Sequence, residues 1–403
     1  MINIVILGGG FSGVRAALDL DWKIRQLADR RKDIRITLID KNPAQTFYPN
    51  LYEVASIYGM DHQHPYHTKL RGTIGIPYEE IFSGTRINVI TAEVIEVNLA
   101  AQHVLTAGFN LHPFDYLVIA LGAVPSTFGV PGADEYAFKF KSVEDGLLLA
   151  DKIEEFSHGA GNGTKPRIII GGGGFTGVEL ATELARRAVI TVVEAGPVIM
   201  GPIGERERLL IQRRLHDLGI TVLVNAPIAE VKPNQVKLQD GAKLSADIII
   251  WSGGVKASAM MRQIAGLMLD DKDRIMVNGS LQTLHHPNVF AVGDNNIFTD
   301  QRVGRPVPQV APVAIAQGKV AAENIARLIG GIKLEEYKPE YSAWVTPVGG
   351  KQAVAYVGKR SYSGWTGYLI RQAIDLRYYF SVLPFWQAFK LYLGDIEIFS
   401  RND

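Results

Sequence analysis

Hydrophobic and polar positions follow the same order in two separate parts of the chain. Residues 2–7 form a continuous apolar run, a glycine cluster and a stretch of helical character come next, and a second apolar run occupies residues 34–39. The same order begins again at residue 167 and ends with an apolar run at residues 190–193. Continuous apolar runs are typical of parallel strands that are covered on both faces. The pattern therefore predicts two strand–helix–strand units in an α/β protein.

Shorter elements fill the rest of the chain. Residues 87–106 and 221–250 have the pattern of short β segments. Residues 159–166, Gly-Ala-Gly-Asn-Gly-Thr-Lys-Pro, have the composition of a flexible connector and are expected to lead into a second domain. Residues 313–329 predict a helix with small residues on one face. Beyond about residue 335 the composition changes, which indicates a separate C-terminal module.

The first unit carries glycines at a spacing that favours phosphate binding. Gly8, Gly10 and Gly13 follow the first strand in a G-x-G-x-x-G pattern. The first glycine permits a tight turn, the second lets a pyrophosphate approach the backbone, and the third lets the helix pack closely on the strand. Asp40 ends the second strand and can accept hydrogen bonds from ribose hydroxyls. The interval from Gly13 to Asp40 is longer than usual, and we assign the excess to a polar extended helix or surface loop at residues 21–33.

The second unit repeats the motif with a preference of its own. Gly172, Gly174 and Gly177 have the same spacing, and Glu194 ends the following strand. A carboxylate at this place accepts a hydrogen bond from the 2′-hydroxyl of NAD and repels a 2′-phosphate, and no arginine follows it closely. We therefore expect NADH rather than NADPH. Glu179 lies in the first turn of the helix, where a carboxylate either complements the helix dipole or takes part in the chemistry, and both readings stay open.

A third segment is suited to complete a flavin site in the first unit. Gly293 and Asp294 follow an apolar strand, and the next helix has a proline, Pro312, at its start. A dinucleotide as long as FAD needs a second contact for its ribose and phosphate groups, which Gly293 and Asp294 can provide. The positive end of the helix dipole would stabilise the negative charge of a reduced flavin. We therefore assign FAD to the first unit.

The C-terminal segment predicts two short amphipathic helices, one over residues 364–380 and one after Pro384. Aromatic faces of this kind suit a protein that lies in the membrane interface. A hairpin packed on the core or on a partner subunit is the alternative. The apolar faces consist of Trp365, Tyr368, Leu369, Leu376, Tyr379 and Phe380 in the first helix and Phe385, Trp386, Phe389, Tyr392 and Leu393 in the second, with Arg371, Asp375, Arg377, Gln387 and Lys390 off them.

Composition excludes several classes of protein. The chain has 403 residues, a formal net charge of +1 and no cysteine. The balanced charge gives no broad positive field, so we expect no nucleic-acid partner. Without cysteine there is no disulfide, thiolate nucleophile or iron–sulfur cluster. No apolar run reaches the roughly 18 residues of a spanning helix, and the N-terminus enters a strand without the features of a signal peptide, so we expect the protein on the cytoplasmic side.

We expect no metal site. His62, His64 and His67 lie close together in the sequence, but Pro65 interrupts them and no acidic residues stand at helical spacing beside them. A solvated loop is the favoured interpretation of this segment.

The two glycine motifs, Gly293 with Asp294 and the aromatic tail together resemble the type II NADH:quinone oxidoreductases, also called alternative NADH dehydrogenases. The resemblance covers nearly the whole chain. In that family the first unit binds FAD, the second binds NADH, and the segment after Gly-Asp lines the quinone pocket. The more specific stretches are Phe-Tyr-Pro-Asn-Leu-Tyr-Glu-Val-Ala-Ser at 47–56, Asp-Tyr-Leu-Val-Ile-Ala-Leu-Gly-Ala at 115–123, Gly-Val-Glu-Leu-Ala at 177–181 and Ile-Trp-Ser-Gly-Gly-Val at 250–255.

The resemblance also implies roles for single residues. It places Glu179 between the nicotinamide and quinone sites and Gln317 in the quinone pocket. The pocket helix of the family usually reads Ala-Gln-x-Ala-x-Gln-Gln-Gly, whereas residues 311–318 read Ala-Pro-Val-Ala-Ile-Ala-Gln-Gly, so only the last glutamine is kept. Further contacts implied by the resemblance are Phe11, Ser12, Lys41, Tyr48, Val94, Ala311 and Ala314 for FAD and Gly254 for NADH.

These observations predict two Rossmann-like dinucleotide-binding domains and a C-terminal amphipathic helical module at the membrane interface. We expect an FAD domain at residues 1–145 and 271–335, an NADH domain at 146–270 and the membrane-anchoring module at 336–403. The resemblance implies a non-proton-pumping NADH:quinone oxidoreductase, in which hydride passes from NADH to N5 of FAD and two electrons then pass to a membrane quinone. We expect it to be peripheral to the cell membrane, and a homodimer stays open. The alternatives are a soluble FAD-dependent NADH reductase of another electron carrier and a redox-sensing interaction protein that binds FAD and NADH.

Overall fold

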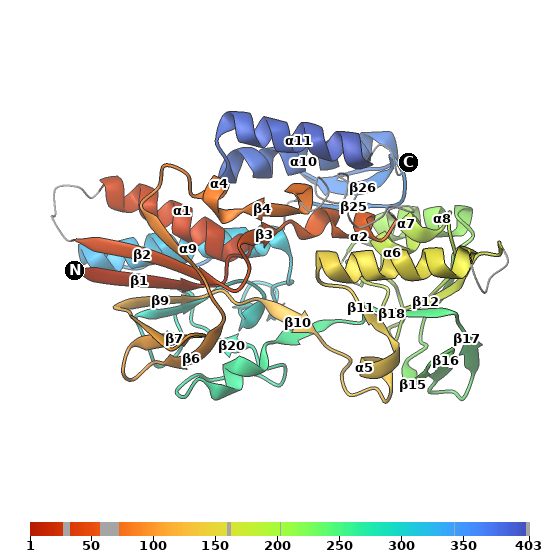
Figure 1. Cartoon of the computed structure of the whole chain (residues 1–403), viewed down its shortest axis with the longest axis horizontal. Helices are drawn as coiled ribbons and strands as arrows, with labels where there is room; N and C mark the ends of the chain where they lie inside the picture. The colour runs from red at the N-terminus through yellow and green to blue at the C-terminus, as the bar shows by residue number, and fades with distance from the viewer. Residues whose placement is uncertain (27–32, 57–71, 159–162, 202, 342, 400–403) are drawn as a thin grey trace.

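A computed structural model describes residues 1–26, 33–56, 72–158, 163–201, 203–341 and 343–399 (Figure 1). Two domains, each built on a parallel sheet, lie side by side, and the C-terminal helices lie across them. This arrangement confirms the α/β class and the two Rossmann-like units that the sequence predicted.

The first domain contains a five-stranded parallel sheet in the order β21-β9-β1-β2-β5. The chain begins in its centre, since β1 pairs with both β2 and β9. The strands are β1 (Ile2–Leu7), β2 (Ile34–Asp40), β5 (Ile87–Thr91), β9 (Tyr116–Ile119) and β21 (Val289–Ala291).

Both faces of this sheet are covered, which explains the unbroken apolar run of β1. Ile6 packs in a cluster with α1 (Phe11–Gln26) and α9 (Ala311–Gly330) on one face, and Leu7 packs in a separate cluster on the other. The two helices approach closely because a Cβ on Gly318 would lie 2.4 Å from the carbonyl oxygen of Ser12. A glycine is therefore required where α9 crosses α1.

The second domain repeats the plan with a five-stranded parallel sheet in the order β11-β18-β12-β13-β14. Helices α6 (Val143–His158), α7 (Phe175–Leu184) and α8 (Glu205–Asp217) accompany it. The strands are β11 (Phe138–Lys139), β12 (Arg167–Gly171), β13 (Val189–Val193), β14 (Thr221–Leu223) and β18 (Ile248–Trp251).

Each domain also carries an antiparallel three-stranded sheet. These sheets confirm the short β segments predicted from the sequence. They consist of β6 (Val94–Asn98), β7 (His103–Thr106) and β8 (Asn110–Pro113) in the first domain and of β15 (Ile228–Lys232), β16 (Gln235–Leu238) and β17 (Lys243–Ser245) in the second.

Two antiparallel strands connect the domains. β10 (Ala123–Pro125) carries the chain from the first domain towards the second and pairs with β19 (Val255–Ala257), which carries it back. Nε1 of Trp251 donates a hydrogen bond to the carbonyl oxygen of Ser126 over 2.8 Å beside this crossing. The crossing therefore fixes the two parallel sheets with respect to each other.

The C-terminal module begins with an antiparallel sheet and ends with two helices. The sheet consists of β25 (Ala343–Pro347), β26 (Ala353–Val357) and β27 (Arg360–Tyr362). The helices are α10 (Trp365–Val382) and α11 (Phe385–Phe399), close to the predicted bounds. No helix in the described ranges is long and apolar enough to cross a membrane.

This module bridges both dinucleotide domains (Figure 1). The ring of Trp344 in β25 lies 6.0 Å from that of Phe175 in α7, and the ring of Tyr379 in α10 lies 5.0 Å from that of Phe47 in the first domain. The remaining short elements are β3 (Ala44–Thr46), η1 (Tyr48–Asn50), α2 (Leu51–Val54), β4 (Gly75–Pro77), α4 (Tyr78–Ile81), α5 (Ala133–Tyr136), η2 (Ala259–Gln263), β20 (Ile275–Met276), η3 (Gly293–Asn295), β22 (Asn296–Ile297), β23 (Thr299–Asp300) and β24 (Arg305–Pro306).

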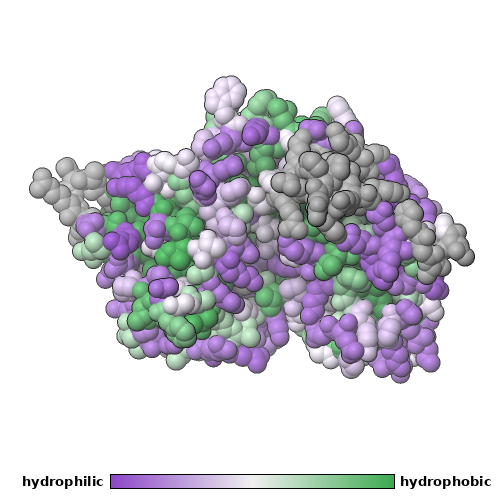
Figure 2. Space-filling view, in the orientation of Figure 1, coloured by the Kyte–Doolittle hydropathy of each residue, from purple (hydrophilic) through white to green (hydrophobic). Residues whose placement is uncertain are grey.

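The two C-terminal helices turn some of their polar positions inward. Arg371 and Asp375, which lie off the apolar face of α10, are buried, whereas Trp365 and Leu369 on that face are exposed. α11 behaves similarly, since Trp386 is 76% exposed. Figure 2 shows hydrophobic side chains at the upper edge of the molecule, where α11 lies. Part of each predicted apolar face therefore points away from the protein core, but Tyr379, on the predicted face of α10, is fully buried, and Arg377 and Lys390, off the faces, are exposed.

Candidate active site

The two glycine loops have the same geometry. Gly8 and Gly172 follow the first strand of each unit with φ angles of 96° and 115°, in the region that favours glycine. A Cβ on Gly13 would lie 1.9 Å from the carbonyl oxygen of Gly8, and a Cβ on Gly177 would lie 2.0 Å from that of Gly172. Glycine is thus required at the first position of each loop for the tight turn, and at the third position for the close approach of helix to strand.

The middle glycines of both loops face open space. A Cβ on Gly10 or on Gly174 would meet no atom within 4 Å among the described residues. These positions have an ordinary backbone conformation, so neither the turn nor packing demands a glycine there. A group that approaches the backbone from outside, such as a pyrophosphate at the start of α1 or α7, gives the physical reason for it.

An acidic side chain is attached to each loop in the same way. Oδ2 of Asp40 accepts a hydrogen bond from the backbone nitrogen of Gly9 over 2.7 Å. Oε2 of Glu194 accepts one from the backbone nitrogen of Gly173, also over 2.7 Å. Each carboxylate is therefore held beside its glycine loop, where the ribose of a bound dinucleotide is expected.

The side chain of Gln317 holds the Gly293 turn in place. Oε1 of Gln317 accepts hydrogen bonds from the backbone nitrogen of Gly293 and from Nδ2 of Asn296, each over 2.7 Å. The Gln317 side chain is 1% exposed, and its Nε2 has no partner among the described residues. A Cβ on Gly293, whose φ is 79°, would lie 2.7 Å from Oγ of Ser12. This turn therefore packs directly against the first glycine loop.

Tyr48, Lys141 and Asp294 gather at one place beside that turn. The ammonium group of Lys141 lies 4.3 Å from the centre of the Tyr48 ring. Desolvation raises the pKa of the Asp294 carboxyl, and the charge of Lys141 acts in the opposite direction. Desolvation, followed by the charges of Asp294 and Asp40, raises the pKa of Tyr48 to about 12. The sequence did not single out Lys141, because no local pattern marks it.

Other predicted FAD residues lie in varied surroundings. Phe11 packs edge to face against Tyr378 of α10, with ring centres 5.0 Å apart. Val94 is buried in the core, so only its backbone could contact a cofactor, and Lys41 is exposed. Ala311 and Ala314 lie in the first turn of α9, which has its proline at the start as predicted.

Gly254, the remaining predicted NADH contact, follows the strand next to the second glycine loop. Its φ is 147°, and its carbonyl oxygen accepts a hydrogen bond from the backbone nitrogen of Ser126 over 3.0 Å. The neighbouring Gly253 leaves no room for a side chain on Gly172, because a Cβ on Gly172 would lie 2.7 Å from the Cα of Gly253. The Gly253 backbone thus lies directly against the second loop.

Glu179 lies in α7 and faces the C-terminal module. Desolvation raises the pKa of its carboxyl to about 7, although the positive charge of Arg371 opposes the shift. A carboxyl with such a pKa can both hold and release a proton near neutral pH. The sequence predicted Glu179 in the first turn of this helix, but α7 begins at Phe175 and has no acidic residue in its first turn, so the helix-dipole reading loses its support.

Beside Glu179 lies a buried polar cluster that sequence reasoning missed. Arg371 donates a hydrogen bond to Oε1 of Glu53 over 2.9 Å and another to Oδ1 of Asn50 over 2.7 Å. Nε of Arg371 also lies 3.7 Å from the Asp375 carboxylate. The signal was present in part, since Arg371 and Asp375 stand four residues apart on the polar side of an aromatic helix.

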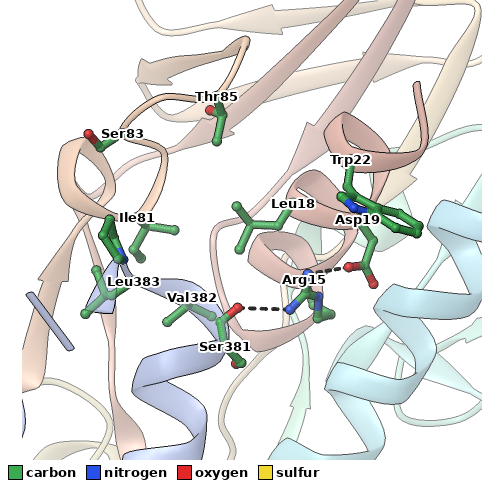
Figure 3. Close-up of a pocket in the computed structure, with 11 residues that line it drawn as sticks. Arg15, Leu18, Asp19, Trp22, Ile81, Ser83, Thr85, Ser381, Val382 and Leu383 are labelled. Atoms are coloured by element: carbon green, nitrogen blue, oxygen red, sulfur yellow. Dashed lines mark hydrogen bonds and ion pairs between the residues drawn. The ribbon is translucent and has the colours of Figure 1, made fainter. Parts of the chain in front are cut away.

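A surface groove of about 560 Å³ lies away from all of these residues (Figure 3). It runs between α1, α4 and the end of α10, where Arg15 donates a hydrogen bond to the carbonyl oxygen of Ser381 over 3.1 Å. None of the predicted site residues lines it. We therefore do not assign the cofactors to this groove.

The described residues contain no group of histidine and acidic side chains that could hold a metal ion. The histidines at positions 62, 64 and 67 lie outside the described residues.

A glycine loop with an attached acid in each of two parallel-sheet domains defines a flavoprotein that binds two dinucleotides. The open middle glycines leave room for a pyrophosphate at the loop of each domain. The chain belongs to the pyridine nucleotide-disulphide oxidoreductase family, whose model matches residues 2–318. Because the chain has no cysteine, the disulphide chemistry in the family's name does not apply to it.

Comparisons with individual proteins agree with this family. The chain is 28% identical to the type II NADH:quinone oxidoreductase of Staphylococcus aureus over 96% of this chain and 98% of that protein. NDH2 of Plasmodium falciparum, solved in complex with NADH, has the same fold, with a TM-score of 0.78, 17% identity and 98% coverage of both chains. The sulfide:quinone oxidoreductase of Aquifex aeolicus has a TM-score of 0.78 and 19% identity, covering 98% of this chain and 92% of that one.

Proposed function

We propose that this protein is an NADH:quinone oxidoreductase that uses FAD and pumps no protons. The observation that carries the proposal is the pair of complete dinucleotide loops in a chain without cysteine. Relatives named for sulfide:quinone or disulphide chemistry share the fold, but thiol chemistry needs side chains that this sequence lacks. The near full-length similarity to type II NADH:quinone oxidoreductases supports quinone as the acceptor.

In this proposal the first domain holds FAD. Gly8, Gly10 and Gly13 receive the pyrophosphate, Asp40 binds the ribose, and Asp294 contacts the central part of the cofactor. When bound, FAD supplies the chemistry that accepts hydride at N5 and passes electrons on as a pair. The start of α9 at Ala311 directs a positive helix end at the cofactor, and Lys141 adds a positive charge nearby.

In the second domain, the glycine loop and Glu194 bind NADH and discriminate against a 2′-phosphate. Glu179 then stands between the nicotinamide and the quinone, where it can exchange a proton. We assign Gln317 a positioning role, because its side-chain oxygen is occupied by Gly293 and Asn296. Its contact with quinone, which the resemblance implies, remains a prediction.

We also propose that α10 and α11 form the membrane-facing surface on the cytoplasmic side. Large apolar side chains are exposed along both helices, and few charges interrupt them. The corresponding domain division is residues 1–145 with 271–335 for FAD, 146–270 for NADH and 336–403 for the membrane-facing module. The exposed residues that support this surface are Trp365, Leu369, Ile374, Phe380, Phe385, Trp386, Phe389, Leu393 and Ile396.

The test is steady-state oxidation of NADH by the FAD-loaded protein with ubiquinone, menaquinone and ferricyanide analogues offered separately. We expect flavin bleaching by NADH and turnover with at least one quinone. Bleaching with ferricyanide turnover but no quinone turnover would favour a soluble reductase of another carrier. A protein without bound flavin, or without bleaching, would contradict the proposal as a whole.

A further inference from the structure

In the described part of the chain, three buried carboxyl groups lie around the guanidinium of Arg371 between α2, α10 and α11. Glu53, Asp375 and Asp395 all belong to the protein interior, and so does Arg371. If all three carboxyls were ionised, the cluster would carry an uncompensated double negative charge in a medium of low dielectric constant. Such a charge is costly, and proteins avoid it by retaining protons.

The pKa values of the three carboxyl groups are raised, as this charge balance requires. Desolvation raises the pKa of Glu53 to about 8, against the charge of Arg371, and that of Asp375 to about 6. Desolvation likewise raises the pKa of Asp395 well above its usual value. A pKa of about 8 keeps Glu53 largely protonated at neutral pH, and the shift of Asp395 has the same direction and cause.

Several charged and titratable groups of the described residues lie around Glu53 and its cluster. α10 contributes Arg371, Asp375, Tyr368 and Tyr379, and α11 contributes Asp395. Tyr52 in α2 donates a hydrogen bond to Oε1 of Glu53 over 2.9 Å. α7 contributes Glu179 and Glu183, and Arg187 just beyond it donates to the carbonyl oxygen of Ser56.

A small cavity joins these groups. Glu53, Tyr52, Glu183, Asp395 and Arg371 all line it. Its accessible volume of about 20 Å³ is enough for one water molecule. Its lining also includes the half-buried Tyr368 and Gln372 and the exposed Ile396.

The hydrogen bonding of Asp395 indicates independently that the cavity holds a water molecule or a carboxyl proton. Its Oδ2 accepts hydrogen bonds from Tyr379 and from Nδ2 of Asn50. Its Oδ1 has no hydrogen-bond partner among the described residues, although the side chain is 4% exposed. A buried oxygen of this kind on the wall of a polar cavity is satisfied by its own proton or by a water there.

The inner end of the cluster reaches Glu179. Arg371 acts electrostatically on both Glu53 and Glu179, and Tyr52 lies close enough to Glu179 and Glu183 for their charges to raise its pKa. Glu179 and Glu183 share one face of α7 because they are four residues apart. The carboxyl groups thus extend from the surface cavity to the residue assigned to the reaction centre.

The reaction needs a proton from outside. Oxidation of one NADH by one quinone consumes one proton and yields NAD and a quinol. The hydride brings one hydrogen nucleus with both electrons, so the second hydrogen of the quinol must arrive as a proton. Ferricyanide differs, because two of them take the electrons of one NADH and a proton is released.

We propose that Glu53 and Asp395 take up protons from solvent through this cavity and supply, through Glu179, the proton that quinone reduction consumes. The inference rests on the proposed quinone reductase activity. Glu53 and Asp395 do not touch the substrate in this scheme, and their effect is confined to the supply of protons.

The experiment compares the FAD-loaded variants Glu53→Gln, Asp395→Asn and Glu207→Gln. Glu207 is a buried carboxyl group of the second domain that hydrogen-bonds Ser361 and belongs to no part of the cluster, so it is the matched control. Each holoenzyme is reduced with NADH and then mixed rapidly with a short-chain ubiquinone analogue or with ferricyanide. Flavin reoxidation is followed in H₂O and D₂O at several pH values.

We expect Glu53→Gln to slow reoxidation by the quinone about 100-fold, within the range that a positioned proton donor contributes. Reoxidation by ferricyanide should change less than about twofold. The wild-type quinone rate should fall as the pH rises through about 8, and Glu53→Gln should lack this fall. Asp395→Asn should show a smaller loss with a larger solvent isotope effect, and Glu207→Gln should match the wild type.

The proposal would be overturned if Glu53→Gln kept the wild-type rate with both acceptors, or if it lost the same factor with both. Either result would leave the proposed quinone reductase activity intact. A wild type that reduces ferricyanide but no quinone would overturn both. Infrared spectra of the wild-type holoenzyme add a measurement that needs no variant to fold. At neutral pH they should contain the carbonyl band of a protonated carboxyl group that shifts in D₂O, and its absence would also overturn the proposal.

Discussion

Arg371 in the penultimate helix donates a hydrogen bond to Glu53 over 2.9 Å, although 318 positions separate the two residues in the sequence. The contact joins the C-terminal module to the segment that follows the first dinucleotide loop. Both side chains are buried, so this hydrogen bond is shielded from solvent. Loss of Arg371 would remove its positive charge from beside the carboxyl groups of Glu53 and Asp375.

We expect Arg371→Leu to lower the free energy of unfolding by about 3 kcal/mol or more at neutral pH, because it leaves the buried Asp375, whose pKa is about 6, ionised without this positive charge and removes the donor to Glu53. Arg371→Lys, which keeps the charge, should lose less. Chemical denaturation of the holoprotein measures both. If the leucine variant were as stable as the wild type, the carboxyl groups would already be neutral without the guanidinium.

The same cluster predicts a pH dependence of stability. The pKa of Glu53 is raised from 4.5 to about 8, and those of Glu179 and Asp375 are raised to about 7 and about 6. An acid whose pKa rises on folding binds its proton more tightly in the folded state. Its contribution is therefore present below about pH 4.5 and is lost as the pH rises to about 8.

In Glu53→Gln, the fall in unfolding free energy between these pH values should be shallower than in the wild type. The difference in slope should reach at most about 1.4 kcal/mol per pH unit, the value for one proton. Denaturation series at several pH values measure it. Parallel curves for the two proteins would show that Glu53 is ionised throughout.

Gly10 and Gly13 should respond differently to alanine. A Cβ on Gly13 would lie 1.9 Å from a carbonyl oxygen, whereas a Cβ on Gly10 meets nothing within 4 Å in the described part of the chain. We expect Gly13→Ala to lower the Tm of the apoprotein. Gly10→Ala should keep that Tm but weaken FAD binding about tenfold or more, as measured by flavin fluorescence titration. Unchanged FAD affinity in Gly10→Ala would place the cofactor elsewhere.

Glu194→Gln should weaken the preference for NADH over NADPH. A hydrogen bond to a charged group contributes about 1.5 to 3 kcal/mol, so the ratio of kcat/KM values for the two nucleotides should fall about 10- to 100-fold. Glu205→Gln, an exposed acid at the start of α8, is the control and should leave the ratio unchanged. A ratio that does not move in Glu194→Gln would mean that the ribose lies away from this carboxylate.

Replacing Phe385 and Trp386 by serine should reduce sedimentation with anionic vesicles about tenfold, because these aromatic side chains are 61% and 76% exposed. Turnover with ferricyanide should remain. Leu111→Ser, at an exposed apolar position of the first domain, is the control. If vesicle binding persisted and a dimer dissociated instead, the aromatic faces would be a subunit interface.

The dinucleotide loops could be predicted from the sequence because their geometry is set locally. Gly8, Gly13 and Asp40 each act within one strand–helix–strand unit, so spacing alone identifies them. The cluster around Arg371 could not, because it forms only when distant segments meet. The helical period placed Arg371 off the apolar face of α10 but did not say that this polar side points inward. Lys141 was missed for the same reason, since only the folded chain brings it to Tyr48.

The bridging position of α10 limits how far the chain can be divided. Tyr378 donates a hydrogen bond to Gln45 over 2.7 Å, and Tyr379 packs on Phe47. A fragment that ended before this helix would leave Gln45, Phe47 and Glu53 uncovered in the first domain. The C-terminal module therefore cannot be exchanged or removed like an appended tag, and a chimaera with another C-terminal module would need a new complementary surface on the first domain.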